Sequence, residues 1–113
     1  MRVTQSATLS PALAQEAQKL GQLLVRLRIA RGIRQGDAAL RAGLSRNTAY
    51  RLEKGDPGLA VGQILRYLDA IAPGKTLLEL LSETDPTLVA LSEREKTKRV
   101  RGLSGEELRA LDF

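Results

Sequence analysis

The chain has 113 residues, the length of one small domain, and carries 18 Lys and Arg against 13 Asp and Glu, for a formal net charge of +5. It contains no Cys and no His, which excludes disulfide scaffolds, Cys/His zinc sites, Cys nucleophiles and every His-based triad. No acid pair or nucleophile–base set is evident among the remaining residue types. We therefore expect neither an enzyme nor a metal or cofactor site.

The apolar composition favours helices. Leu (21) and Ala (14) far outnumber Val (5) and Ile (4), and aromatic residues make up only 3%, whereas strands select β-branched and aromatic side chains. No apolar run approaches the roughly 18 residues of a membrane span, and residues 1–5 lack the apolar stretch of a signal peptide. We expect a soluble, cytoplasmic, all-α protein.

The first predicted helix follows a Ser-Pro pair at residues 10–11 and ends near Gly32, because Ser suits an N-cap, Pro the first turn and Gly a terminus. One face carries apolar residues at helical spacing, namely Leu13, Ala17, Leu20, Leu24 and Leu27. Gly21 weakens this long version, so the helix could instead begin near Gln15. We take residues 1–14 as an N-terminal arm.

Two short helices are predicted next, over residues 34–41 and from Ser45 to about Lys54. Gly43 between them is available for a positive φ, and Ser45 is a candidate N-cap. The positions expected to face inward are Ala39, Leu44, Ala49 and Leu52. The sequence Gly-Asp-Pro-Gly at residues 55–58 ends the second helix.

Two further helices complete the predicted bundle, over residues 60–72 and 76–82. The apolar positions of the first are Val61, Ile64, Leu65, Leu68 and Ile71. The second is dense in leucine, with Leu77, Leu78, Leu80 and Leu81. So short a helix cannot turn all four toward one small core, and we predict that they contribute a dimer interface. The bundle is expected to span residues 15–83.

Residues 84–113 are predicted to form a C-terminal extension for dimerisation or partner binding. It begins with a helical segment over residues 87–91. The basic run at residues 94–101 is interpreted as a solvated or flexible segment, and a DNA arm or partner contact is the alternative. The pattern S-x-x-E at residues 104–107 fits a capping box that opens a last helical turn or two.

Positive charge is concentrated in the first half, where residues 1–60 net +6 and the remaining residues net −1. Such asymmetry favours a polyanion-binding face on the basic half. The second of the two short helices turns Arg46, Asn47, Tyr50 and Arg51 outward. Arg fits guanine O6 and N7, and Asn fits adenine N6 and N7, which is the chemistry of major-groove readout.

In this region the sequence resembles the lambda-repressor/Cro-like (Xre-type) helix-turn-helix regulators, possible antitoxins among them. The resemblance covers about Leu20 to Leu81 and is carried by residues 28–35, the Ala-Gly-Leu-Ser turn at 42–45, and Arg-Leu-Glu-Lys-Gly at 51–55. It implies a compact five-helix DNA-binding bundle. Double-stranded DNA is the implied partner.

The resemblance also implies roles for single residues. Those at base-contacting positions are Arg46, Asn47 and Arg51. Those at phosphate-contacting positions are Arg34, Gln35, Thr48, Tyr50 and Lys54. Gln35 could instead bridge to the recognition helix, and Tyr50 could merely cover it. Arg28 would form a structural ion pair with Glu53.

Three positions depart from the family pattern. Arg34 stands where a Ser, Thr or Asn cap is usual, and Gly36 costs about 1 kcal/mol relative to a better helix former. Ala38 replaces a larger aliphatic residue, for which Leu40 could compensate. None of these departures removes a position that would contact DNA.

The function expected from these features is a sequence-specific transcriptional repressor that reads a palindromic operator as a homodimer. The alternative is an antitoxin that also binds a partner toxin. Its partner-binding segment would use the apolar residues of the C-terminal extension, namely Leu88, Val89, Leu91, Leu103, Leu108, Leu111 and Phe113.

Overall fold

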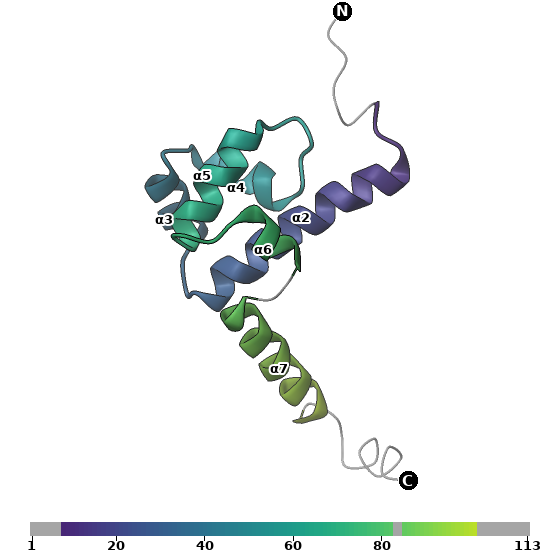
Figure 1. The fold of residues 1–113 in the computed structure, drawn as a ribbon, viewed down its shortest axis with the longest axis vertical. Helices are drawn as coiled ribbons and strands as arrows, with labels where there is room; N and C mark the ends of the chain where they lie inside the picture. Colours follow the sequence, from purple (N-terminus) through teal and green to yellow (C-terminus); the bar gives the residue numbers. More distant parts are fainter. Residues whose placement is uncertain (1–7, 83–84, 102–113) are drawn as a thin grey trace, which may run out of the picture.

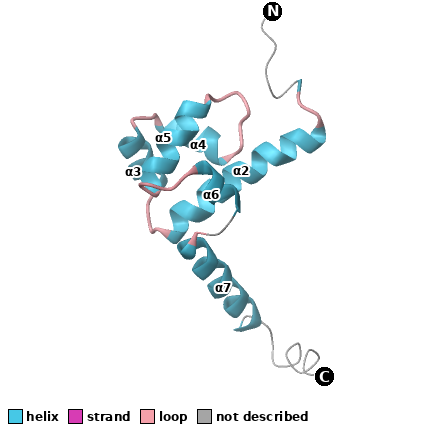
Figure 2. Cartoon of the chain, in the orientation of Figure 1, coloured by secondary structure: helices cyan, strands magenta, loops and turns pink. Residues whose placement is uncertain are grey.

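A computed structural model describes residues 8–82 and 85–101 of the chain, and its regular structure there is entirely α-helical (Figure 2). The helices are α2 (Pro11–Ala30), α3 (Gln35–Ala42), α4 (Arg46–Glu53), α5 (Val61–Ile71), α6 (Leu77–Ser82) and α7 (Pro86–Arg101). Helices α2 to α6 form the predicted five-helix bundle, and α7 projects from it (Figure 1). None of these described helices is long and apolar enough to cross a membrane.

Helix α2 is central to the fold, because it contacts α4, α5, α6 and α7. Helix α3 packs against α4 and α5. The core is almost wholly aliphatic, as the scarcity of aromatic residues predicts, and Tyr67 is its largest fully buried side chain. The other core residues are Leu23, Leu24, Leu27, Ala38, Ala39, Ala42, Ala49, Leu52, Leu68, Ile71, Ala72, Leu80 and Leu88.

Helix α2 begins at the earlier of its two predicted starts. The Ser10 hydroxyl accepts a hydrogen bond from the Leu13 amide at 3.3 Å, so residues 11–14 of the expected arm are helical. The packing of α2 explains why a glycine stands at position 21 within this long helix. A Cβ atom there would lie only 2.7 Å from the Glu53 carbonyl oxygen and the Gly55 amide nitrogen. Glycine therefore lets α2 cross close against the end of α4.

The turn between α3 and α4 has the predicted geometry. Gly43 adopts φ 69° in the left-handed region, and the Ser45 hydroxyl caps α4 by accepting from the Thr48 amide at 3.0 Å. Helix α3 has no side-chain cap at Arg34. The compensation expected from Leu40 is absent, because that side chain is 81% exposed.

Helix α5 buries Leu68 and Ile71 as predicted, and Ile64 packs partly buried against the core. Val61 and Leu65 are 63% and 46% exposed, whereas Tyr67 is fully buried. Arg66 reaches across to the turn of the helix-turn-helix unit, where its Nη2 donates to the Gly43 carbonyl at 3.0 Å. On the buried side of α5, the Tyr67 hydroxyl donates a hydrogen bond to Glu53 on α4.

The four leucines of α6 divide between core and surface. Leu80 is buried and Leu77 packs partly buried against the core, whereas Leu78 and Leu81 are 77% and 50% exposed. Leu80 therefore has no surface to offer an interface, which corrects its assignment. The six-residue helix distributes its side chains around its axis, so only Leu78 and Leu81 remain as candidates.

Helix α7 is continuous through the basic run, so the run is helical rather than irregular. Its side chains at 94 and 96–98 are exposed, as expected of a solvated segment. Asp85 starts the helix by accepting hydrogen bonds from the Thr87 and Leu88 amides at 2.9 and 3.3 Å. The next turns dock on α2, where Arg26 donates to Glu95 at 3.0 Å. The predicted capping box at 104–107 lies outside the described residues.

The Asp85 carboxylate ties three elements together. It is 2% exposed and lies 3.2 Å from the Lys75 ammonium and 3.3 Å from the Arg31 guanidinium. Burial opposes its ionisation, but hydrogen bonds from Thr87 and Lys75 outweigh burial and hold the pKa of Asp85 well below its usual range. Asp85 is therefore a charged anchor between α7 and the bundle.

Candidate nucleic-acid interface

Helix α4 turns one continuous polar face outward. Arg46, Asn47 and Tyr50 are exposed, while Ala49 and Leu52 on the opposite face are buried. At 3.6 residues per turn, positions 46, 47, 50, 51 and 54 fall on a single arc of the helix. We call these five residues the outer arc of α4. The structure thus brings together all three residues proposed to contact bases and two of those proposed to contact phosphate.

Arg46 opens the outer arc beside the start of α3. A Cβ atom built on Gly36 would lie 3.4 Å from Arg46 Nε, so the guanidinium of Arg46 packs over this glycine. Arg34 is exposed at the same end of α3, which places its charge at the rim of this face.

Gln35 makes the bridge that was one of its two expected roles. Its side-chain amide donates to Glu53 Oε1 at 2.9 Å. Thr48 is held by Ser45, whose hydroxyl donates to Thr48 Oγ1 at 2.9 Å. Since Thr48 Oγ1 is the acceptor in that bond, its own proton can point outward to another acceptor.

The C-terminal half of the outer arc carries two further contacts. The Lys54 ammonium lies 5.4 Å from the centroid of the Tyr50 ring, a cation–π arrangement, and Tyr50 itself is 52% exposed. Arg51 Nε donates to Asp56 Oδ2 at 2.7 Å. Gly58 and Arg51 together lower the pKa of Asp56 by hydrogen bonding to its carboxylate.

Behind the outer arc, Glu53 is the centre of a buried polar network. Its carboxylate accepts from Arg28 Nε at 2.6 Å and Arg28 Nη2 at 3.0 Å, from Gln35 and from the Tyr67 hydroxyl. Arg28 also donates from Nη1 to the Ile33 carbonyl at 2.9 Å. Four helices therefore meet at one carboxylate, since these residues lie on α2, α3, α4 and α5.

The network is electrostatically consistent. Burial opposes ionisation of Glu53, but the bonds from Arg28, Tyr67 and Gln35 outweigh burial and lower its pKa. The hydrogen bond to Glu53 raises the pKa of Arg28, and burial together with the neighbouring carboxylate raises the pKa of Tyr67. All three effects favour the ion pair with a neutral tyrosine.

Comparison with protein families decides the classification. A family model described as a helix-turn-helix domain matches residues 19–81. The chain belongs to this helix-turn-helix family. The match spans most of α2 and all of α3 to α5, and ends within α6, so it contains the whole outer arc and the Glu53 network. Comparison with curated proteins and with solved structures gave no match.

Three residues of this helix-turn-helix unit were not singled out by the sequence. Tyr67 lies three residues after Ile64 and four before Ile71, so its helical spacing could have placed it in the core. Arg66 and Asp56 carry no comparable signal. Their contacts join segments whose relative placement depends on the folded bundle.

Proposed function

We propose that this chain is a sequence-specific DNA-binding transcriptional regulator whose α4 enters the major groove. One observation carries the proposal: the second helix of the unit exposes Arg46, Asn47 and Arg51 on one arc. Arg and Asn are the side chains that recognise guanine and adenine edges bidentately. The buried network on the opposite face of α4 supports this reading, because it fixes which side of the helix points outward.

Phosphate contacts would flank the base contacts. Arg34 and Gln35 stand at the N-terminus of α3, where free amides favour an anion. The Thr48 hydroxyl, Tyr50 and the Lys54 ammonium lie on or beside the outer arc. Each contacted phosphate should contribute about −0.9 to the slope of log affinity against log salt concentration.

Selection of duplexes from a random-sequence pool tests the proposal. We expect a recurring sequence whose affinity falls steeply with salt, and a loss of about 1–3 kcal/mol on Asn47→Ala at a single base pair. Recovery of no preferred sequence, or binding that is insensitive to salt, would count against it.

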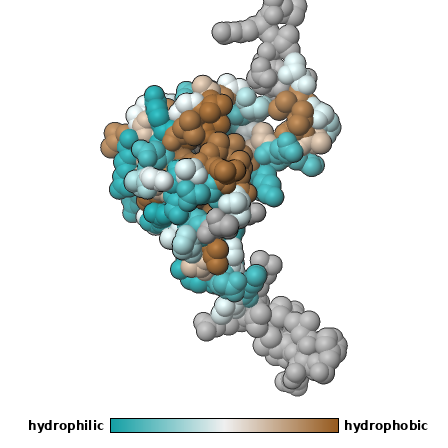
Figure 3. Space-filling view, in the orientation of Figure 1, coloured by the Kyte–Doolittle hydropathy of each residue, from teal (hydrophilic) through white to brown (hydrophobic). Residues whose placement is uncertain are grey.

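We further propose a homodimer that occupies a palindromic operator and represses by occlusion. The exposed Leu78 and Leu81 on α6 supply apolar surface, and Leu81 borders an apolar groove along α2 with Leu13 and Leu20. Figure 3 shows hydrophobic residues on the bundle and again on the N-terminal half of α2. Glu16 and Lys19 also line this groove. If two α2 helices pair antiparallel about a two-fold axis, Glu16 of each would face Lys19 of the other.

Sedimentation of Leu78→Ser and Leu81→Ser variants tests the dimer. We expect weaker self-association with unchanged helical content, because both side chains are exposed in the single subunit and the melting temperature should fall only as far as the dimer stabilised the fold. In the DNA-bound state, half-sites should recur about one helical turn apart. A chain that stays monomeric on DNA would refute this part of the proposal and leave the base contacts standing.

An antitoxin that binds a partner toxin is the second candidate. The observation that favours it is the exposed apolar side chains of α6 and α7, since Val89, Leu81 and Leu78 are 48%, 50% and 77% exposed. Leu88 cannot contribute, because it is buried in the core. The leucines beyond residue 101 lie outside the described residues. Full operator affinity from the purified chain alone, as a dimer, favours the homodimeric regulator.

A further inference from the structure

The Arg51–Asp56 ion pair restrains a proposed base-reading side chain within its own subunit. Arg51 lies in the last turn of α4 and is 42% exposed, and Asp56 follows in the loop to α5. Arg51 Nε donates to Asp56 Oδ2 at 2.7 Å. Within the described residues the two terminal nitrogens of Arg51 make no hydrogen bond, so they remain available as donors.

The backbone holds Asp56 in place. The Asp56 amide donates to the Arg51 carbonyl at 3.0 Å and the Gly55 amide to the Leu52 carbonyl at 3.1 Å. With Gly55 at φ 76°, these bonds form the Schellman motif that ends α4. The same residue therefore binds Arg51 through its main chain and through its side chain.

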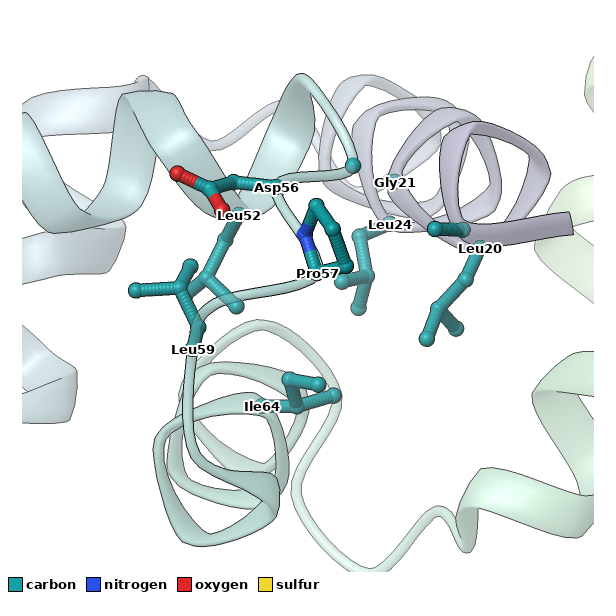
Figure 4. A pocket seen from close by; sticks show the side chains of 10 residues that line it. Leu20, Gly21, Leu24, Leu52, Asp56, Pro57, Leu59 and Ile64 are labelled. Carbon is teal, nitrogen blue, oxygen red and sulfur yellow. The ribbon is translucent and has the colours of Figure 1, made fainter. Parts of the chain in front are cut away.

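The loop beyond Asp56 is anchored as well. Asp56 Oδ1 accepts from the Gly58 amide at 2.8 Å, so both carboxylate oxygens are engaged. Pro57 and Leu59 line a small apolar hollow between α2, α4 and α5, and the Asp56 carboxylate points away from it (Figure 4). Apolar packing on one side and hydrogen bonds on the other thus fix the carboxylate that receives Arg51.

We propose that Asp56 is a positioning residue that presents Arg51 end-on to a guanine. With Nε bound to Asp56, only the two terminal nitrogens can form a bidentate pair with O6 and N7. This inference rests on the proposed function of α4 and specifies one base of its target. Restraining a long side chain before binding removes part of the entropy that recognition would otherwise lose.

A second consequence concerns DNA of the wrong sequence. Asp56 adds a negative charge beside the outer arc, which repels phosphate wherever Arg51 finds no guanine. Removing this carboxylate should strengthen binding to random DNA while weakening the preference for guanine. A residue that merely stabilised the loop would lower binding to both kinds of DNA together.

The test uses the full chain, the duplex recovered from random-pool selection, and duplexes in which each guanine is replaced in turn. Arg51→Ala should abolish discrimination at one G·C pair, a change of about 5- to 150-fold. Asp56→Ala should lower discrimination at that same pair by about two- to tenfold, with an unchanged or higher affinity for random DNA. Asp56→Asn should keep the loop hydrogen bond and lower the discrimination as Asp56→Ala does, because its amide nitrogen cannot accept from Arg51 Nε.

Asp69→Asn is the control, because it removes the same charge from an exposed position on α5; it should leave the discrimination unchanged. The inference is overturned if Asp56→Ala retains full discrimination at the pair read by Arg51, or if that pair is not G·C. The proposed function fails separately, when the unaltered chain itself shows no preferred sequence.

Discussion

Removing the Glu53 carboxylate should destabilise the protein far more than removing a surface charge. Its side chain is 6% exposed and that of Arg28 is 15% exposed, so water cannot replace the lost pairing in full. Glu53→Ala leaves the Arg28 guanidinium buried without its charged partner, although its bond to the Ile33 carbonyl remains. Breaking one partner of a buried pair costs about 3–5 kcal/mol, a large share of the 5–15 kcal/mol that is typical of a small domain.

Two milder substitutions separate the parts of this network. Tyr67→Phe removes a single hydroxyl donor to a charged group and should cost about 1.5–3 kcal/mol. Glu53→Gln keeps the shape of the side chain and loses the charge. We expect it to fall between Tyr67→Phe and Glu53→Ala, because the amide can still accept one bond from Arg28.

Urea denaturation followed by circular dichroism measures these free energies, and a double-mutant cycle isolates the pair. The combined Arg28→Ala/Glu53→Ala variant should lose less stability than the two single losses added together, because neither charge then remains buried alone. A loss below about 1 kcal/mol for Glu53→Ala, the value of an exposed pair, would refute the reasoning. So would strict additivity in the cycle.

Three further predictions concern the packing of α2 and α7. Gly21→Ala should destabilise the protein by about 1–3 kcal/mol and lower its melting temperature, because the added Cβ meets backbone atoms at the end of α4 and in the loop after it. Gly62→Ala is the control: its Cβ meets open space, and it should raise the melting temperature slightly. Asp85→Asn should make the free energy of unfolding fall less steeply on acidification. Because folding lowers the pKa of Asp85, its carboxylate stabilises the fold above the unfolded pKa of about 3.9, and this stabilisation is lost as the pH falls through the folded pKa. The Asp69→Asn variant, which removes the same charge from an exposed position on α5, is the control. Leu88→Ala should cost about 2–5 kcal/mol in urea denaturation; a loss under 0.5 kcal/mol would show that α7 does not fold cooperatively with α2.

The helix-turn-helix unit could be predicted because its signals are local. A left-handed glycine at 43 and a Ser cap at 45 determine the turn through residues adjacent in sequence. The family match over residues 19–81 and the helical bundle confirm that part of the prediction. The outward direction of Arg46 and Asn47 follows from helical periodicity alone, once Ala49 and Leu52 are assigned to the core.

What could not be predicted depends on contacts between distant segments. The basic run at residues 94–101 carries no local signal that it packs on the bundle, yet the Arg26–Glu95 pair and the cap at Asp85 make it part of a helix docked on α2. Gly21 likewise reads as a weak point of α2 until the end of α4 lies against it. In both cases the residue departs from a local preference that tertiary packing offsets.

The two acids near the end of α4 show how the orientation of this helix is set. An isolated helix of eight residues is unstable in water, and a carboxylate near a helix C-terminus opposes the helix dipole by about 0.3–1 kcal/mol. Glu53 and Asp56 both occupy this unfavourable end, and each is paired with an arginine, Arg28 behind the helix and Arg51 on its outer arc. Helix stability alone would disfavour both acids. Their positions are explained if Glu53 fixes the rotation of α4 on the bundle and Asp56 holds the Arg51 side chain pointing away from it.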